Sequence, residues 1–195
     1  MMMRRRLDRL GRMAARVAYD AGGLNDAIIV YCSRYGDNAL TLSLLEEITA
    51  GELPSPAGFS MAVHNSLAGL LSIVASNKRA HTAVAAGPES LGAGLLEAAM
   101  IMADQPDRRV MLLYCHEPLA PIYEPFRRLG ETSIAVALLL EPVVSADGER
   151  LVAKMDGRAA IPPDEFEALS FVRFLLSPDH QAAFFSVGLR WSWGD

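Results

Sequence analysis

The chain has 195 residues, of which 51% are hydrophobic and 21% are charged, and its formal net charge is -5. This length predicts one folded unit, a single domain over residues 1–195. The composition excludes disorder, collagen and a coiled coil as descriptions of the whole protein. The mean hydropathy of +0.20 is high for an ordinary exposed surface, which indicates that a partner covers some apolar area.

The first 17 residues are basic, whereas the rest of the chain is acidic. The basic segment carries six arginines and one acid, Asp8, and the remainder carries 12 basic and 22 acidic residues. A chain with an acidic body is not expected to bind nucleic acid. Apolar residues at helical spacing predict an amphipathic helix over residues 4–19 with solvated arginines, and contact with an acidic protein is the alternative. The six arginines are Arg4, Arg5, Arg6, Arg9, Arg12 and Arg16.

Short runs rich in Val, Ile and aromatic residues alternate along the chain with helical patterns. The runs lack strict polar alternation, which predicts strands that are covered on both faces. This order predicts an α/β fold, and the pair Asp147-Gly148 predicts a hairpin of residues 134–144 and 149–155 in a mixed sheet. The predicted strands cover residues 27–32, 110–115 and 134–140, and the predicted helices cover residues 39–49, 60–75, 90–103 and 164–176.

The predicted helix at residues 90–103 has apolar residues on every face. Such a helix is surrounded by protein, and its small residues Gly92, Ala93 and Gly94 allow another backbone to approach closely. A single layer over a sheet would leave one side of this helix in water. We therefore expect a buried central helix. A chain of this length is not expected to supply the whole second layer that would cover it.

No segment has the pattern of an export signal, because charged residues interrupt the apolar positions near the start. The longest charge-free stretch, residues 53–77, contains prolines, serines, His64 and Asn65. Lipid would leave these polar groups unsatisfied, so the stretch is predicted to be buried in protein rather than to span a membrane. Two cysteines, Cys32 and Cys115, are too few for a disulfide framework or a zinc site and favour the cytoplasm.

The sequence contains no recognised cofactor motif. Glycine-rich phosphate loops and a nucleophile elbow are absent, and the chain has only two lysines. The histidines show no metal-ligand spacing with a third acidic or thiol ligand. We therefore expect neither a metal nor another cofactor. The histidines are His64, His81, His116 and His180.

A thiol nucleophile needs a neighbouring base, and Cys115 precedes His116 and Glu117 at a predicted strand end. Loops after the carboxyl ends of strands are where α/β sites form. Adjacent residues on a strand point to opposite sides, however, so Cys115 and His116 are poorly placed to pair. A small self-sufficient acyl transferase or thioesterase that uses Cys115 with His116 or His81 stays open as an alternative function.

Two further polar segments allow two interpretations each. The pair His64-Asn65 lies in an apolar helical segment, where it is a hydrogen-bonded core pair or a wall of a ligand tunnel. The polar residues 33–37 follow Cys32. They are either a simple glycine turn at the end of a strand or a turn that borders a functional site.

Residues 54–73 carry a family resemblance. They read PSPAGFSMAVHNSLAGLLSI, which resembles the S-P-x-x-F-x-x-S-V-H-N-x-x-A-G-x-x-S-I signature of small β-ketoacyl synthase-like proteins, the ketosynthase chain-length factors of aryl polyene clusters. Ala62 stands where that signature has serine. Supporting motifs over roughly residues 4–140 are RRRLDRLGRM at 4–13, SRYGD at 33–37, TAVAAG at 82–87, LLEA at 95–98 and the strand at 110–114 with Glu117-Pro118.

The resemblance implies a thiolase-like fold, in which active condensing enzymes carry a nucleophilic cysteine at the start of a buried central helix. That helix corresponds to residues 90–103, and the position of the cysteine falls on Gly87, Pro88 and Glu89. None of these residues can form an acyl thioester. The second half, which supplies two histidines in catalytic relatives, also lacks a counterpart at this length.

The resemblance therefore implies a non-catalytic, chain-length-factor-like subunit. It would pair with a full-length β-ketoacyl synthase in aryl polyene, polyketide or fatty-acid-like elongation on an acyl carrier protein. A homodimeric scaffold that binds the acidic carrier protein through its basic segment is a further hypothesis. The expected tunnel wall comprises Gly87, Pro88, Glu89, His64 and Asn65, and the expected carrier-protein contact comprises Arg4, Arg5, Arg6 and Arg9.

Overall fold

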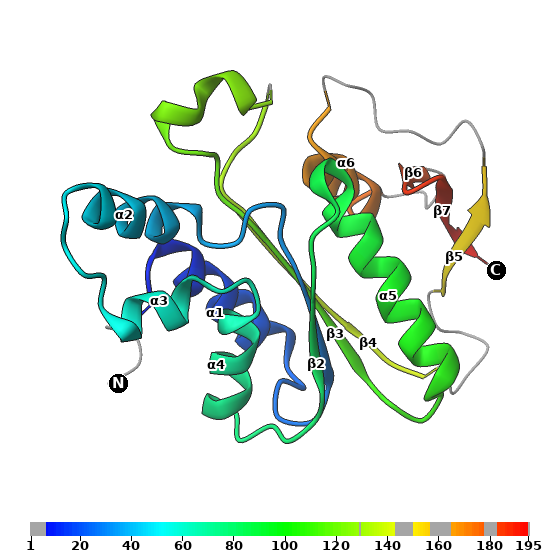
Figure 1. The fold of residues 1–195 in the computed structure, drawn as a ribbon. Helices are drawn as coiled ribbons and strands as arrows, with labels where there is room; N and C mark the ends of the chain where they lie inside the picture. Colours follow the sequence, from blue (N-terminus) through cyan, green and yellow to red (C-terminus); the bar gives the residue numbers. More distant parts are fainter. Residues whose placement is uncertain (1–6, 129, 143–149, 157–164, 178–182, 195) are drawn as a thin grey trace.

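The computed structural model describes residues 7–128, 130–142, 150–156, 165–177 and 183–194. Helices and strands alternate through most of the chain (Figure 1). The helices are α1 (Arg9–Ala21), α2 (Asn38–Thr49), α3 (Pro56–Ala62), α4 (Ser66–Val74), α5 (Ser90–Asp104) and α6 (Glu167–Leu175), with short 3-10 turns η2 (Gly87–Glu89) and η3 (Pro121–Phe126). The strands are β1 (Ile28–Cys32), β2 (His81–Val84), β3 (Val110–His116), β4 (Ile134–Leu140), β5 (Arg150–Met155), β6 (Ala183–Ser186) and β7 (Leu189–Gly194).

Four strands form a mixed central sheet in the order β2-β1-β3-β4. The first three strands are parallel, and β4 runs antiparallel to β3, so the predicted α/β fold with a mixed sheet is confirmed. Every residue of β1 and β3 is buried, as their unbroken apolar runs predicted. The carboxyl ends of the parallel strands point toward the loops that begin at residues 33, 85 and 117.

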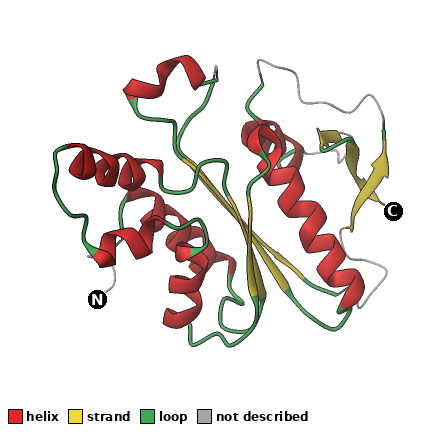
Figure 2. Ribbon diagram, viewed as in Figure 1, coloured by secondary structure: helices red, strands yellow, loops and turns green. Residues whose placement is uncertain are grey.

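One face of the central sheet is covered by α1 and α4 (Figure 2). Apolar residues of these helices pack on alternate residues of β1 and β3. Helix α1 begins where the Asp8 carboxylate accepts hydrogen bonds from the amides of Leu10 and Gly11, at 3.2 and 2.7 Å. The helix therefore starts later than the predicted residue 4, and residues 1–6 lie outside the described residues.

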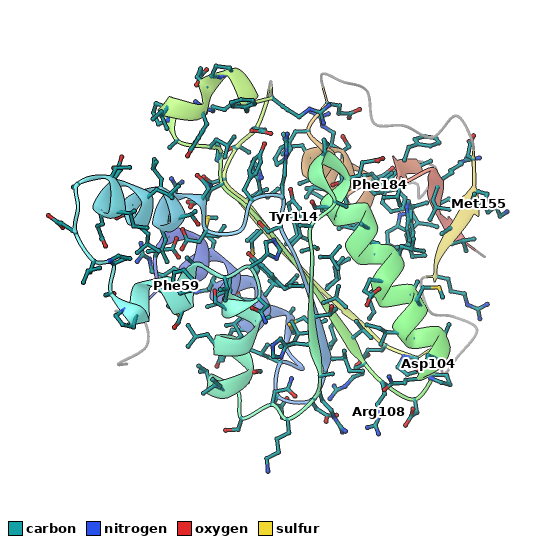
Figure 3. The ribbon with its side chains drawn as sticks, in the orientation of Figure 1. Phe59, Asp104, Arg108, Tyr114, Met155 and Phe184 are labelled. Carbon is teal, nitrogen blue, oxygen red and sulfur yellow. The ribbon has the colours of Figure 1, made fainter. Side chains whose placement is uncertain are left out.

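The opposite face is covered by α5, which is itself covered by α6 and a second sheet. That sheet is antiparallel with the order β5-β7-β6. Phe171 and Phe174 of α6 and Phe184 of β6 pack with α5 in one buried cluster. Figure 3 places Phe184 beside α6 and the second sheet. The chain thus supplies part of the second layer over α5 by itself.

Three sequence predictions differ from the structure. The helix predicted over residues 60–75 is broken into α3 and α4, which are bent by 101° around His64. The predicted hairpin is wrong, because β4 pairs with β3 whereas β5 pairs with β7, and its turn at Asp147-Gly148 lies outside the described residues. The helix at 90–103 is not surrounded on every side by the described residues, because the central sheet and α6 with the second sheet cover it while Leu96 and Met100 stay exposed.

Within the described part of the chain, no single helix is both long and apolar enough to cross a bilayer. Helices α3 and α4 reach that length and composition together, but only as a sharply bent pair.

Candidate functional site at the start of the central helix

The segment Gly87–Glu89 forms a 3-10 turn that leads directly into α5. Gly87 adopts a positive φ of 58°, a conformation that glycine accepts without steric cost. The Ser90 hydroxyl donates to the Gly87 carbonyl at 2.7 Å and accepts from the Ala86 amide at 3.0 Å. This arrangement fixes the turn at the amino end of α5, and residues 87–89 themselves carry neither a thiol nor a hydroxyl.

The amino end of α5 is bound by a carboxylate from the C-terminal part of the chain. Glu167, the first residue of α6, accepts hydrogen bonds from the amides of Leu91 and Gly92, both at 2.9 Å. Ser186 of β6 donates its hydroxyl to the same carboxylate at 2.5 Å. Glu89 in turn accepts from the Val187 amide at 2.8 Å. Three segments distant in sequence, residues 87–92, Glu167 and the Ser186-Val187 pair, therefore meet at the start of α5.

Glu167 is only 1% exposed. Burial raises the pKa of this carboxyl group to about 7, and the nearby Glu89 carboxylate also raises it. The three hydrogen bonds from Ser186, Gly92 and Leu91 oppose this effect and lower the pKa. Burial has the larger influence on Glu167, so the group changes its charge near neutral pH.

Sequence reasoning overlooked Glu167, although a signal was available. This acidic residue lies on the side of the predicted helix that also carries Phe171 and Phe174, at helical spacing. An acid on an apolar face is buried only when hydrogen bonds or an opposite charge satisfy it. The partners themselves were not predictable, because they come from segments far away in the sequence.

His64 lies on the other face of the sheet, at the break between α3 and α4. Its Nε2 is 2.9 Å from the carbonyl oxygen of Ser33, and its ring packs on Tyr31 with centroids 5.5 Å apart. Asn65 precedes α4, is exposed and makes no side-chain cap to that helix. The prediction of a hydrogen-bonded core group therefore fits His64, whereas it does not fit the exposed Asn65.

A small pocket of about 130 Å³ borders His64. Tyr31, Met61 and two carboxylates, Asp8 and Asp37, also line it. Burial raises the pKa of Asp37, and the Asp8 carboxylate raises it further. The pocket opens on the face covered by α1 and α4, whereas residues 87–89 lead into α5 on the opposite face. The structure thus places the predicted tunnel-wall residues in two separate regions.

Both cysteines are fully buried. Cys115 packs in the cluster under α1, and burial together with the carboxylates of Asp8 and Glu117 raises the pKa of its thiol. His116 points to the other face and packs on Phe166, with ring centroids 4.8 Å apart. These positions argue against the alternative function, because a thiolate with a neighbouring base is required for nucleophilic attack.

His116 is a buried histidine that stays neutral. Burial lowers the pKa of its ring to about 4, and the charge of Arg34 lowers it further. Its Nε2 lies 3.9 Å from Glu131, whose carboxylate pairs with Arg34 at 2.6 Å. Within the described residues, neither ring nitrogen has a hydrogen-bond partner. This cluster therefore carries an energetic cost that the rest of the fold offsets.

The basic segment is only partly described. Arg9 has an exposed side chain and lies 3.6 Å from the carboxylate of Glu117. Arg4, Arg5 and Arg6 lie outside the described residues. In the part of the chain that the structure describes, no three His, Cys, Asp or Glu side chains are grouped to hold a metal ion.

Comparisons with known proteins show the family and the fold of the chain. The chain belongs to the β-ketoacyl synthase family, because the family description "Beta-ketoacyl synthase, N-terminal domain" matches residues 1–194. Its fold is accordingly the thiolase-like fold that the resemblance implied. No curated protein matches the sequence.

The solved structures that are similar to this chain include two ketosynthase–chain length factor structures. One is a ketosynthase (ApeO) in complex with its chain length factor (ApeC) from Xenorhabdus doucetiae, with 26% identity and a TM-score of 0.79 over 100% of this chain and 81% of that chain. The other is the ishigamide ketosynthase/chain length factor, with 17% identity and a TM-score of 0.60 over 77% of this chain and 49% of that chain. The chain is therefore ketosynthase-like in fold and similar to proteins solved as ketosynthase–chain length factor pairs.

Proposed function

We propose that this chain is a non-catalytic, chain-length-factor-like subunit that pairs with an active β-ketoacyl-acyl carrier protein synthase. The observation that carries the proposal is the start of α5, where Gly87–Glu89 offers no nucleophile and Glu167 binds the helix amides. The buried thiols of Cys32 and Cys115 do not replace the missing group. The similarity to a ketosynthase solved with its chain length factor supports the same assignment.

The proposed docking face is the open edge of β2 together with the two helices beside it. β2 ends the central sheet, and Figure 1 shows it with α4 on one side and α5 on the other. Both helices carry exposed apolar residues, Ile73 and Val74 on α4 and Leu96 and Met100 on α5. An open strand edge pairs with a strand of a partner, and the flanking apolar residues supply buried area. The ketosynthase is the occupant that we assign to this face.

The subunit would limit product length by forming a wall of the acyl tunnel. Steric exclusion by a pocket of fixed length discriminates chain lengths without acid–base chemistry. The candidate wall residues are Gly87, Pro88 and Glu89 at the start of α5, whereas His64 and Asn65 lie in a separate region on the opposite face of the sheet. We place the reaction in aryl polyene, polyketide or fatty-acid-like elongation in the cytoplasm, on an acyl carrier protein that the basic segment contacts.

A pull-down from the native host tests this proposal. We expect the tagged chain to recover a full-length ketosynthase in a one-to-one complex, with masses determined by light scattering. Replacing Met100 by Asp introduces a charge into the docking face and should weaken recovery at least tenfold, because an unpaired buried charge is costly. Met155→Asp is the matched control, since Met155 is exposed on β5, away from this face.

Three results would count against the proposal. A well-folded monomer without a ketosynthase overturns it, and a homodimer without a ketosynthase favours the scaffold hypothesis instead. Equal recovery with Met100→Asp and with Met155→Asp removes the docking face from the proposal.

A further inference from the structure

We infer that the amino end of α5 is a carboxylate-binding site whose occupant is the chain's own Glu167, and that this internal ligand closes the site to acyl groups and other external anions. The exclusion of acyl groups in particular rests on the proposed function, whereas the site itself rests on the geometry alone. Glu167 lies 76 residues from Leu91 in the sequence, so the contact is made by the fold and not by local helix capping.

The carboxylate satisfies helix groups that have no partner inside the helix. The first amides of any α-helix lack an internal acceptor, and the helix dipole places partial positive charge at this end. No side chain within α5 or at its cap position accepts from these amides. Each oxygen of Glu167 takes one amide, Oε2 from Leu91 and Oε1 from Gly92. The arrangement is that of a bound carboxylate ligand.

The surroundings of the carboxylate are fitted to it. A Cβ at position 92 would collide with the Ser186 side chain and approach Glu167 Oε1 to 3.1 Å, so glycine is needed there. Val187 adopts a positive φ of 51°, which is costly for a β-branched residue, and its amide is held by Glu89. The β6–β7 turn is therefore drawn against the start of α5, where Ser186 donates to Glu167.

The groups that hold Glu167 are neutral donors. They are two backbone amides and one hydroxyl, and salt bridges to Glu167 are absent among the described residues. The titratable groups nearby are Glu89, Cys32 and Tyr114. None of these is a cation, so the helix end and Ser186 provide the attraction that keeps the carboxylate in place.

Chemical rescue tests the site directly. Glu167→Gly removes the carboxylate that occupies the site and should lower the melting temperature of the protein. At pH 8, formate at 100 mM and above (a range on the order of weak carboxylate affinities) should restore part of this loss, and the effect should saturate. Chloride at equal ionic strength should not restore it. Glu165→Gly is the matched control, because Glu165 lies two residues away with a partly exposed side chain. For the wild type and for Glu165→Gly, formate and chloride should change the melting temperature equally.

The inference fails if formate shifts all three proteins equally, or if Glu167→Gly is as stable as the wild type. If Glu167→Gly does not fold, Glu167→Gln replaces it, because the amide keeps the size of the side chain but one of its two ends donates rather than accepts. We then expect amide hydrogen exchange at Leu91, Gly92 and Val187 to be roughly ten- to a hundredfold faster than in the wild type. Unchanged exchange at these amides overturns the inference.

These experiments are independent of the partner. The formate response and the exchange rates need no ketosynthase, whereas the pull-down needs no formate. Loss of the formate effect with recovery of a ketosynthase would overturn only the internal ligand. Recovery of a monomer with a saturable formate effect would overturn only the proposed function.

Discussion

Glu167 shows how one buried side chain can make stability depend on pH. Its pKa is about 7 in the folded protein against an ordinary value of 4.5. The folded state therefore binds the proton more tightly than the unfolded state between these values. The resulting stability is fully present below pH 4.5 and is lost as the pH rises through 7.

We predict that Glu167→Gln removes this dependence. Between pH 4.5 and pH 7.5 the wild type should lose about 3 kcal/mol more unfolding free energy than the variant, since one pKa unit corresponds to about 1.4 kcal/mol. Urea unfolding at a series of pH values measures the difference. Parallel profiles for the two proteins would show that Glu167 does not titrate in this interval.

At the scale of single elements, α5 lies unusually close to the central sheet. Gly94 has no side chain, and a Cβ at this position would lie 2.6 Å from Cys32 Sγ and 3.0 Å from a methyl group of Leu112. The sequence indicated a close backbone approach at Gly92–Gly94, and the structure confirms it. Both glycines are needed for contact with different elements, Gly92 with β6 and Gly94 with β1.

We predict that Gly94→Ala destabilises the protein by about 1–3 kcal/mol, because overpacking forces the helix away from the sheet. Adding Cys32→Ala should recover part of this loss, since it removes the sulfur that the new methyl group meets. A double-mutant cycle in urea measures this coupling. If the two substitutions change the unfolding free energy additively, the new methyl group does not press on Cys32, and the helix has shifted in a direction that avoids this contact.

Local sequence pattern predicted the central elements better than the peripheral ones. The strands at 27–32 and 110–115 match β1 and β3 to within one residue at either end, because buried parallel strands are unbroken apolar runs. The break at His64 was missed, since helical periodicity continues through it. It depends instead on the contact between His64 and the Ser33 carbonyl, which no local pattern contains.

The missed parts of the fold depend on long-range pairing. The Asp147-Gly148 turn signal suggested that neighbouring strands pair, yet β5 joins β7, some 40 residues further along. Turn chemistry is a local preference and does not choose the partner strand. A family resemblance assigned Gly87–Glu89 to the position of the missing nucleophile, whereas Glu167 became visible only when the fold brought it to Leu91.

At the scale of the whole molecule, charge is divided between a basic first segment and an acidic remainder. We predict that replacing Arg4, Arg5 and Arg6 together by Ser weakens binding of an acyl carrier protein several-fold at low salt. The difference should shrink as salt is added, because exposed charges are screened. Arg173→Ser, at an exposed position on α6, is the control, and titration calorimetry measures both. Equal affinities at low salt would remove the segment from the carrier-protein contact.

The separation of 76 residues between Leu91 and Glu167 has a consequence for synthesis of the chain. A ribosome adding ~5–20 residues per second makes the amides of α5 roughly 4–15 s before the carboxylate that binds them. During this interval a nascent chain presents both an open helix end and the apolar residues that α6 and the second sheet later cover. Translation of the segment from Glu167 onward therefore completes the covering of the central helix. A chain halted before Glu167 exposes an apolar surface that a chaperone would recognise.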